Sequence, residues 1–202
     1  APQEQRVYGL NACLALFALA GPCAAQGSGL TVYGGFRGGG SFLTEAEPQR
    51  SLSLDASAAG SIALDWGVDS ARQVQLFASY QSTEIAASAS TPAVPLDVSY
   101  LHLGGTNYFE GGIGRGAYVV GGLGATRMAP GLSGLSAEYF PSMNLGLGYQ
   151  WPIAGPLSLR MEVRGYFTLV GSSSRLFCSG GCVLAIKGDG FTQVEGLLGL
   201  NV

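Results

Sequence analysis

The sequence predicts an all-β protein, an eight-stranded antiparallel transmembrane β-barrel. Its clearest stretch, residues 157–169, alternates without a break between apolar and polar side chains, which is the period of a β-strand. The polar face carries Arg160, Glu162 and Arg164, which could not lie unpaired in a dry core. A soluble sheet would turn that face to water, whereas a membrane barrel turns it to the lumen and the apolar face to lipid.

The composition favours the barrel over a soluble sheet. Only 11% of the 202 residues are charged, against roughly 25% in an average soluble domain. The mean hydropathy is positive, yet after the N-terminal region no uninterrupted apolar run has the length of about 20 residues that a spanning helix needs. The apolar residues are therefore distributed in alternation. The formal net charge of −3 argues against nucleic acid as a partner.

The N-terminal region is predicted to be a secretory signal peptide, residues 1–25, that precedes the barrel domain, residues 26–202. Arg6 precedes an apolar stretch, residues 12–20, which Gly21 and Pro22 interrupt before the small residues at 23–25. This is the pattern of a cleaved export signal, with cleavage expected after Ala25. Lipidation of Cys23 is the alternative, but the Ala-Gly-Pro before it fits a lipoprotein signal poorly.

Eight stretches along the rest of the chain read as strands. The fifth has an ambiguous facing, because Val119, Val120 and Leu123 do not alternate cleanly. The predicted strands are Leu30 to Phe42, a strand that ends at Val68, Gln73 to Gln81, Asp97 to Phe109, Ala117 to Met128, Met143 to Trp151, Leu157 to Leu169 and Phe191 to Val202.

The connections between these strands alternate in length. The short ones are residues 69–72, 111–116 and 152–156, and the long ones are residues 44–50, 83–96, 129–138 and 171–190. Bacterial outer-membrane barrels have an even number of strands, long outer loops and short periplasmic turns. With both termini in the periplasm, every long connection would lie outside the cell.

Aromatic residues fall near the predicted strand ends, where an outer-membrane barrel carries its interfacial girdles. Trp66, Tyr149 and Trp151 are close to the short turns, and Phe42 and Phe167 lie toward the long loops.

Over residues 26–202 the chain resembles the family of small eight-stranded outer-membrane barrels, of the OmpA transmembrane-domain and OmpX kind. The matching features are the loop pattern, the glycine-rich stretch at residues 101–109 and the alternating last strand with Leu198 and Leu200. The family's last strand usually ends in an aromatic residue, and Val202 departs from that pattern. The resemblance implies a place in the bacterial outer membrane among lipid and lipopolysaccharide, insertion by the barrel-assembly machinery, and no cofactor.

The polar strand faces gather six charged residues whose formal charges cancel. They are Arg37, Asp65, Arg160, Glu162, Arg164 and Glu195. They belong to strands that are neighbours in a closed barrel, and the interior of eight strands is just wide enough for side chains. Because buried charges must be paired and hydrogen-bonded, we predict a structural salt-bridge network. A gated ion path is the alternative.

His102 is the residue that invites a catalytic interpretation. Some small barrels modify lipid A, and the deacylase type uses a histidine–serine pair. On the predicted strand, however, Tyr100 and Gly104 share the face of His102, while Ser99 points to the opposite face. A base must reach its nucleophile, so we expect a lumenal or interfacial histidine and no enzyme.

Two cysteines remain after the signal peptide, Cys178 and Cys182. One even pair in an exported protein indicates a disulfide. A metal site would need further ligands nearby, and His102, the only histidine, is far away in sequence.

The sequence therefore predicts a non-enzymatic outer-membrane barrel that contributes to envelope integrity or surface interaction through long extracellular loops. A narrow channel for small or apolar ligands, as in OmpW-like proteins, is one alternative. A lipid A-modifying enzyme is another.

Overall fold

The structure is a computed structural model that describes residues 27–43, 51–85, 94–109, 112–131, 136–170, 175–178, 182–185 and 190–202. The predicted signal peptide, residues 1–25, lies outside the described residues. No helix in the described part of the chain is long and apolar enough to cross a membrane.

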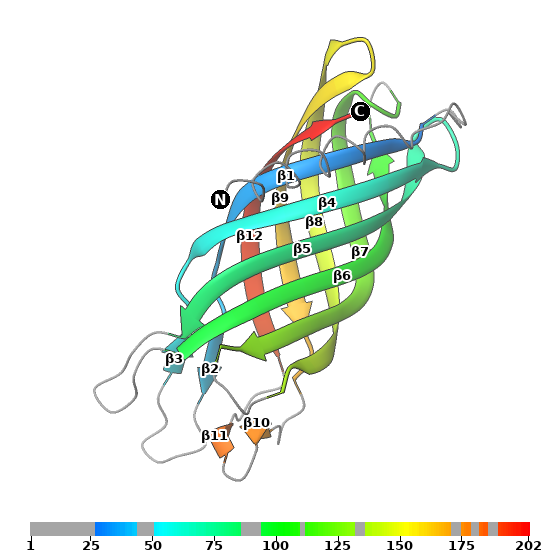
Figure 1. Cartoon of the computed structure of the whole chain (residues 1–202). Coiled ribbons are helices and arrows are strands. Elements are labelled where there is room, and N and C mark those ends of the chain that lie inside the picture. The colour runs from blue at the N-terminus through cyan, green and yellow to red at the C-terminus, as the bar shows by residue number, and fades with distance from the viewer. Residues whose placement is uncertain are drawn as a thin grey trace, which may run out of the picture.

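Eight antiparallel strands close into one barrel in the order β1-β12-β9-β8-β7-β6-β5-β4 (Figure 1). The predicted eight-stranded fold is therefore confirmed. Because the barrel closes, none of its eight strands is left with an unpaired edge, which lipid could not hydrogen-bond. The barrel strands are β1 (Gly29–Gly38), β4 (Ser57–Gly67), β5 (Arg72–Ile85), β6 (Val94–Tyr108), β7 (Gly116–Pro130), β8 (Glu138–Ala154), β9 (Leu157–Thr168) and β12 (Phe191–Asn201).

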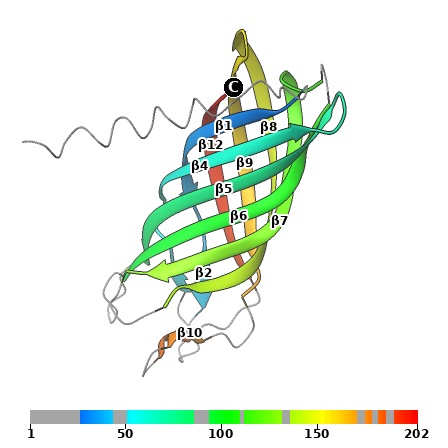
Figure 2. The same cartoon turned by 45° about the vertical axis from the view of Figure 1, so that its right-hand side comes forward.

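The strands are strongly tilted, as both views show (Figures 1 and 2). A path that follows directly paired residues once around the barrel from Gly38 returns to β1 beside Gly29, near the other end of the same strand. Such a stagger couples strand tilt to the width of the lumen. The path runs through Val194, Gly165, Leu145, Gly121, Gly105, Val74 and Trp66.

Two small hairpins lie at one end of the barrel: β2 (Ser41–Leu43) with β3 (Ser51–Ser53), and β10 (Arg175–Cys178) with β11 (Cys182–Ala185) (Figure 1). They interrupt two of the long connections. The prediction that the first strand runs to Phe42 is therefore wrong: β1 ends at Gly38, and Phe42 belongs to β2. Gly39 and Gly40 have positive φ values of 83° and 96°, which end extended pairing and which side chains rarely adopt.

The barrel has an inverted distribution of polarity. Apolar side chains project outward, as Leu123 (66% exposed), Leu145 (68%) and Val163 (57%) do, while polar and charged side chains are buried inside. The ambiguous strand, β7, also follows this rule: Tyr118 and Val120 are buried in the lumen and Leu123 faces outward. Apolar outside and polar inside is the arrangement of a transmembrane barrel.

The short turns lie at the opposite end from the small hairpins (Figure 1). In the turn between β4 and β5, Arg72 pairs with Asp69 at 2.5 Å, and both side chains are exposed. The hydrogen bond from Arg72, supported by the backbone amides of Ala71 and Arg72, holds the pKa of the Asp69 carboxyl below its usual range. This pair fixes the turn but is too exposed to stabilise the barrel much.

We predict that Cys178 and Cys182 form a disulfide. They occupy directly opposed positions of β10 and β11, and the Cα atoms of such antiparallel pairs lie about 4.5–5.5 Å apart, within the range a disulfide spans. Mass spectrometry of unreduced, exported protein should show the bridge, and alkylation of both thiols without reduction would exclude it. Because the closed ring is very small, replacing both cysteines by serine should leave barrel melting unchanged while residues 171–190 become easier to cleave.

Candidate functional site

The lumen brings all six predicted charged residues together, in three one-to-one ion pairs. Arg37 pairs with Glu195 at 2.9 Å, Arg160 with Asp65 at 2.6 Å, and Arg164 with Glu162 at 2.6 Å. Each of these six side chains is at most 1% exposed. The charges come from β1, β4, β9 and β12, which are consecutive around the barrel. Alternation on each strand sends them all inward.

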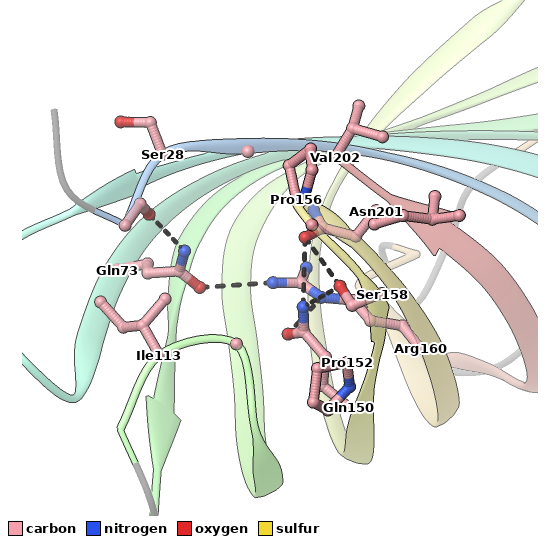
Figure 3. Close-up of a pocket in the computed structure, with 15 residues that line it drawn as sticks. Ser28, Gln73, Ile113, Gln150, Pro152, Pro156, Ser158, Arg160, Asn201 and Val202 are labelled. Atoms are coloured by element: carbon pink, nitrogen blue, oxygen red, sulfur yellow. Dashed lines mark hydrogen bonds between the residues drawn. The ribbon is translucent and has the colours of Figure 1, made fainter. Parts of the chain in front are cut away.

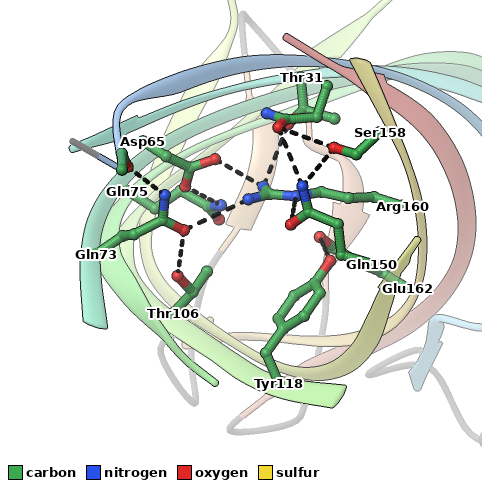
Figure 4. Close-up of polar contacts among 12 residues, drawn as sticks. Thr31, Asp65, Gln73, Gln75, Thr106, Tyr118, Gln150, Ser158, Arg160 and Glu162 are labelled. Carbon is green, nitrogen blue, oxygen red and sulfur yellow. Dashed lines mark hydrogen bonds and ion pairs between the residues drawn. The ribbon is translucent and has the colours of Figure 1, made fainter. Parts of the chain in front are cut away.

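Arg160 occupies the end of the lumen nearest the short turns. Its side chain reaches from β9 across the lumen to Asp65 on β4, past the two intervening strands β12 and β1 (Figure 4). Its Nε donates to Gln150 at 2.9 Å, and its Nη2 donates to the hydroxyl of Tyr108 at 2.9 Å. Nη1 also reaches Thr31 at 3.2 Å. The guanidinium is therefore held from several sides in one plane across the lumen.

A recess of about 260 Å³ opens at this end of the barrel (Figure 3). Gln73, Gln150, Ser158, Arg160 and Asn201 line its polar side. These side chains are bonded to one another: Gln150 donates to Ser158 at 2.5 Å and to Asn201 at 3.1 Å. The recess therefore ends on a network whose donors and acceptors already have partners.

The second ion pair, Arg164 with Glu162, lies on one strand, β9. Two tyrosine hydroxyls, those of Tyr33 on β1 and Tyr118 on β7, donate to the same Glu162 oxygen at 2.5 Å each. Arg164 donates to Gln75 at 2.9 Å, and its guanidinium carbon lies 3.8 Å from the centre of the Phe77 ring. A carboxylate with an arginine and two hydroxyls satisfies its buried charge by direct hydrogen bonds.

The third ion pair, Arg37 with Glu195, is surrounded by aromatic rings. The Tyr166 hydroxyl donates to Glu195 at 2.5 Å. The Arg37 guanidinium lies 4.8 Å from the ring centre of Tyr100 and 5.0 Å from that of Tyr166, and these two rings stack 4.3 Å apart. Arg37 Nη1 and Arg164 Nη1 have no hydrogen-bond partner in the described structure. The ring faces beside both guanidinium groups offset part of that cost.

Two glycines make room for the tyrosines of this network. A Cβ at Gly148 would lie 2.4 Å from the Tyr118 ring, and one at Gly199 would lie 2.4 Å from the Tyr33 ring. Each glycine is the direct register partner of the tyrosine it accommodates. Tyr33 and Tyr118 can bend across the lumen toward Glu162 because no side chain stands between them and the wall.

His102 lies inside the lumen and has the serine contact that the reasoning from its own strand missed. Its Nε2 is 2.9 Å from Ser142 Oγ on β8, and its Nδ1 is 2.8 Å from Asn144 Nδ2. Gly124, which pairs with both His102 and Ser142, has no side chain to separate them. The expectation that His102 has no serine in reach is therefore wrong, because it considered one strand instead of three.

The geometry around His102 nevertheless opposes catalysis. If Asn144 donates to Nδ1, then Nε2 carries the proton and donates to Ser142, so the ring cannot accept the serine proton. His102 is 1% exposed, Ser142 6% and Asn144 5%. The Tyr100 ring stacks 5.5 Å from the imidazole and the Tyr166 ring 6.0 Å from it. The imidazole and the serine are therefore both packed inside the lumen, and the burial of Ser142 opposes the approach of an acyl group.

The predicted girdle residues are divided between the two ends. Trp66, Tyr149 and Trp151 are 40–46% exposed on the outer face toward the short turns, and Phe167 is 37% exposed toward the loops. The side chain of Phe42 lies outside the described residues. No group of three or more potential metal ligands occurs among the described residues.

We predict that Glu162→Gln destabilises the barrel by about 3–5 kcal/mol, because it leaves the Arg164 charge buried without its anion. Urea unfolding in lipid vesicles measures the change. Asp69→Asn is the matched control at the exposed pair and should melt like wild type. Equal stability of Glu162→Gln and wild type would mean that Glu162 is not buried against Arg164.

We predict that Gly148→Ala and Gly199→Ala each destabilise the barrel by about 1–3 kcal/mol, since the new Cβ would push a tyrosine ring away from Glu162. Gly60 faces outward and a Cβ there would meet nothing within 4 Å, so Gly60→Ala serves as the control. The same unfolding assay applies, and a loss at Gly60 equal to that at Gly148 would point to strand propensity instead of ring displacement.

Comparisons with known proteins agree with this architecture. No protein-family model matches the sequence, and no curated protein matches it significantly. Among solved structures, the chain is similar to Neisserial surface protein A (NspA), with a TM-score of 0.56 and 12% identity over 88% of this chain and 97% of that one. It is also similar to the outer membrane protein OprG from Pseudomonas aeruginosa, with a TM-score of 0.51 and 12% identity over 86% of this chain and 94% of that one. This chain therefore has the fold of the small eight-stranded outer-membrane β-barrels.

Proposed function

We propose that the protein is a non-enzymatic outer-membrane barrel that contributes to envelope integrity or surface interaction through its extracellular loops. The observation that carries the proposal is the lumen. Three buried ion pairs, five tyrosines and several amides fill it from the short-turn end toward the loops. A filled interior is a scaffold, and in such barrels it is the connections at one end that vary and contact partners.

The asymmetry of the connections supports this assignment. At the short-turn end, residues 155–156 join β8 to β9 and residues 68–71 join β4 to β5. At the other end, residues 39–56 and 169–190 join barrel strands and carry the two small hairpins. In outer-membrane barrels the long connections face the outside, so we assign the hairpin end to the cell surface.

The membrane location follows from the barrel's outer face. Exposed apolar residues surround it on all sides, including Val32, Leu103, Leu147 and Leu198, each more than 50% exposed. A continuous apolar belt on a soluble protein would drive aggregation. The solved structures that share this fold include one named as an outer membrane protein, and together these points support the outer membrane as its place.

A channel would need a water-filled path through the lumen. At the recess, Arg160 and the residues bonded to it, which we call the Arg160 layer, lie across the lumen (Figure 3). The guanidinium there makes hydrogen bonds to Asp65, Gln150 and Tyr108. To open a path, these bonds would have to break with the charges still in a low-dielectric interior. We therefore favour the structural network over the gated ion path.

We predict that the purified full chain produces no conductance steps in a planar bilayer, where a large porin serves as the positive control. The expectation rests on the bonds of Arg160 to Asp65, Gln150 and Tyr108, which would have to break before an ion could pass. Regular single-channel steps that change size in Arg160→Gln would contradict the structural network and favour the channel.

Expression of the protein should leave the mass spectrum of the host's lipid A unchanged. A deacylated product that is absent when Ser142→Ala is expressed would establish the enzyme instead.

A further inference from the structure

The outer face of the barrel carries an arginine just above its apolar belt. Arg127 on β7 lies between Thr126 and Met128, both completely buried in the lumen, so its side chain projects outward. Its register partners are Ser99 on β6 and Tyr139 on β8. Ser99 in turn pairs with Tyr80 on β5. The four residues therefore form one continuous outward row, Tyr80–Ser99–Arg127–Tyr139, across four neighbouring strands.

This row marks the boundary between the apolar belt and the polar rim. The next outward row toward the short turns is apolar and consists of Ala78, Leu101, Ala125 and Pro141. The next row toward the loops contains Ser82, Asp97 and Ala129. Along β7, only apolar residues and glycine face outward between Arg127 and Arg115, and at strand rise and tilt this interval crosses about 30 Å, close to the thickness of a membrane.

Arg127 stands apart from the four arginines that form ion pairs in the described part of the chain. Arg37, Arg160 and Arg164 in the lumen and Arg72 in its turn each pair with a carboxylate, and Arg127 belongs to none of these four pairs. The nearby acid, Asp97, accepts a hydrogen bond from the Tyr80 hydroxyl. The charge of Arg127 also lies within electrostatic range of this hydroxyl. Tyr80 is 50% exposed and Tyr139 68% exposed, so both tyrosines flank the arginine at the surface.

We propose that Arg127, together with Tyr80 and Tyr139, binds the phosphate headgroup of a lipid in the outer leaflet. A guanidinium presents two parallel N–H donors that match a phosphate, and it does so here at the level where headgroups begin. Tyrosines at this depth keep the ring in the apolar region and the hydroxyl among headgroups. The Tyr139 hydroxyl can donate to the same phosphate there, while Tyr80, whose hydroxyl donates to Asp97, contributes its ring beside the site. The proposal identifies a lipid site for the proposed membrane barrel and rests on that location.

Asp97, a negative charge beside the proposed site, distinguishes phosphate binding from a structural role of Arg127. Its carboxylate lies one row nearer the loops, beside Tyr80, where it repels an incoming phosphate. If Arg127 only served a structural role by facing Asp97, removing either charge would have a similar effect. If Arg127 binds phosphate, removing the two charges has opposite effects on lipid affinity.

The test measures binding of lipid A that carries its phosphates to the full-length, detergent-purified protein by native mass spectrometry, with chemically dephosphorylated lipid A as the comparison. We expect Arg127→Gln to weaken binding about tenfold, as loss of a charge-assisted phosphate contact does. Arg127→Lys should retain an intermediate affinity, because it keeps the charge but loses the fork. Asp97→Asn should bind more tightly than wild type. Arg115→Gln, an arginine at the opposite rim, should stay within about twofold of wild type.

All variants must first show the melting temperature of wild type in detergent. We expect this result because the substituted residues lie on the outer face of the barrel and not in its lumen. Equal affinity of Arg127→Gln and wild type would overturn the proposal, as would equal binding of phosphorylated and dephosphorylated lipid. A loss in Asp97→Asn that matches the loss in Arg127→Gln would assign the pair a structural role. These outcomes are independent of bilayer conductance, so a failed lipid site and a failed assignment of the closed barrel remain distinguishable.

Discussion

The charges of three arginines buried inside a closed barrel must each be paired with a carboxylate, and much of the structure follows from that requirement. The interior of eight strands holds side chains and little else, so water cannot hydrate the charges. Each guanidinium therefore has a carboxylate partner within 3 Å. The tyrosines that donate to Glu162 and Glu195 complete the shells of the carboxylates, and Gly148 and Gly199 lack side chains because those tyrosines need the space.

The same requirement connects parts of the wall that are far apart in the sequence. The ion pair between Arg160 and Asp65 spans the lumen between β9 and β4, and Tyr118 on β7 meets Tyr33 on β1 at one Glu162 oxygen. These cross-lumen bonds fix the barrel's cross-section, whereas backbone pairing alone fixes only neighbouring strands. A wall held from within in this way can support long connections at one end without using them for stability.

The outer face of the barrel contacts lipid instead of water. Lipid favours apolar side chains on the wall, and the exposed leucines and valines meet this requirement. At the two rims the lipid headgroups begin, and there the outward side chains include the aromatic residues Trp66, Tyr149, Tyr80 and Tyr139. Arg127 lies in this transition on the loop side. In the described part of the chain, the barrel therefore has a polar network buried in its lumen and an outward row with Arg127 at the loop-side boundary of its apolar belt.

The sequence by itself determined the barrel, its strand number, its alternating connections and the identity of the six lumenal charges. Period-two alternation is a local signal, and charge opposite an apolar face needs no neighbour to be recognised, as residues 157–169 show. It did not determine the end of β1, where two glycines with positive φ break the strand before Phe42, nor the facing of β7, where Val119 and Val120 are both apolar. Only the tertiary structure decided which arginine meets which carboxylate, and that Ser142 lies beside His102. Those contacts depend on strand register and tilt. The register places the His102 side chain across Gly124 from Ser142, and the residues around His102 in the sequence do not reveal this contact.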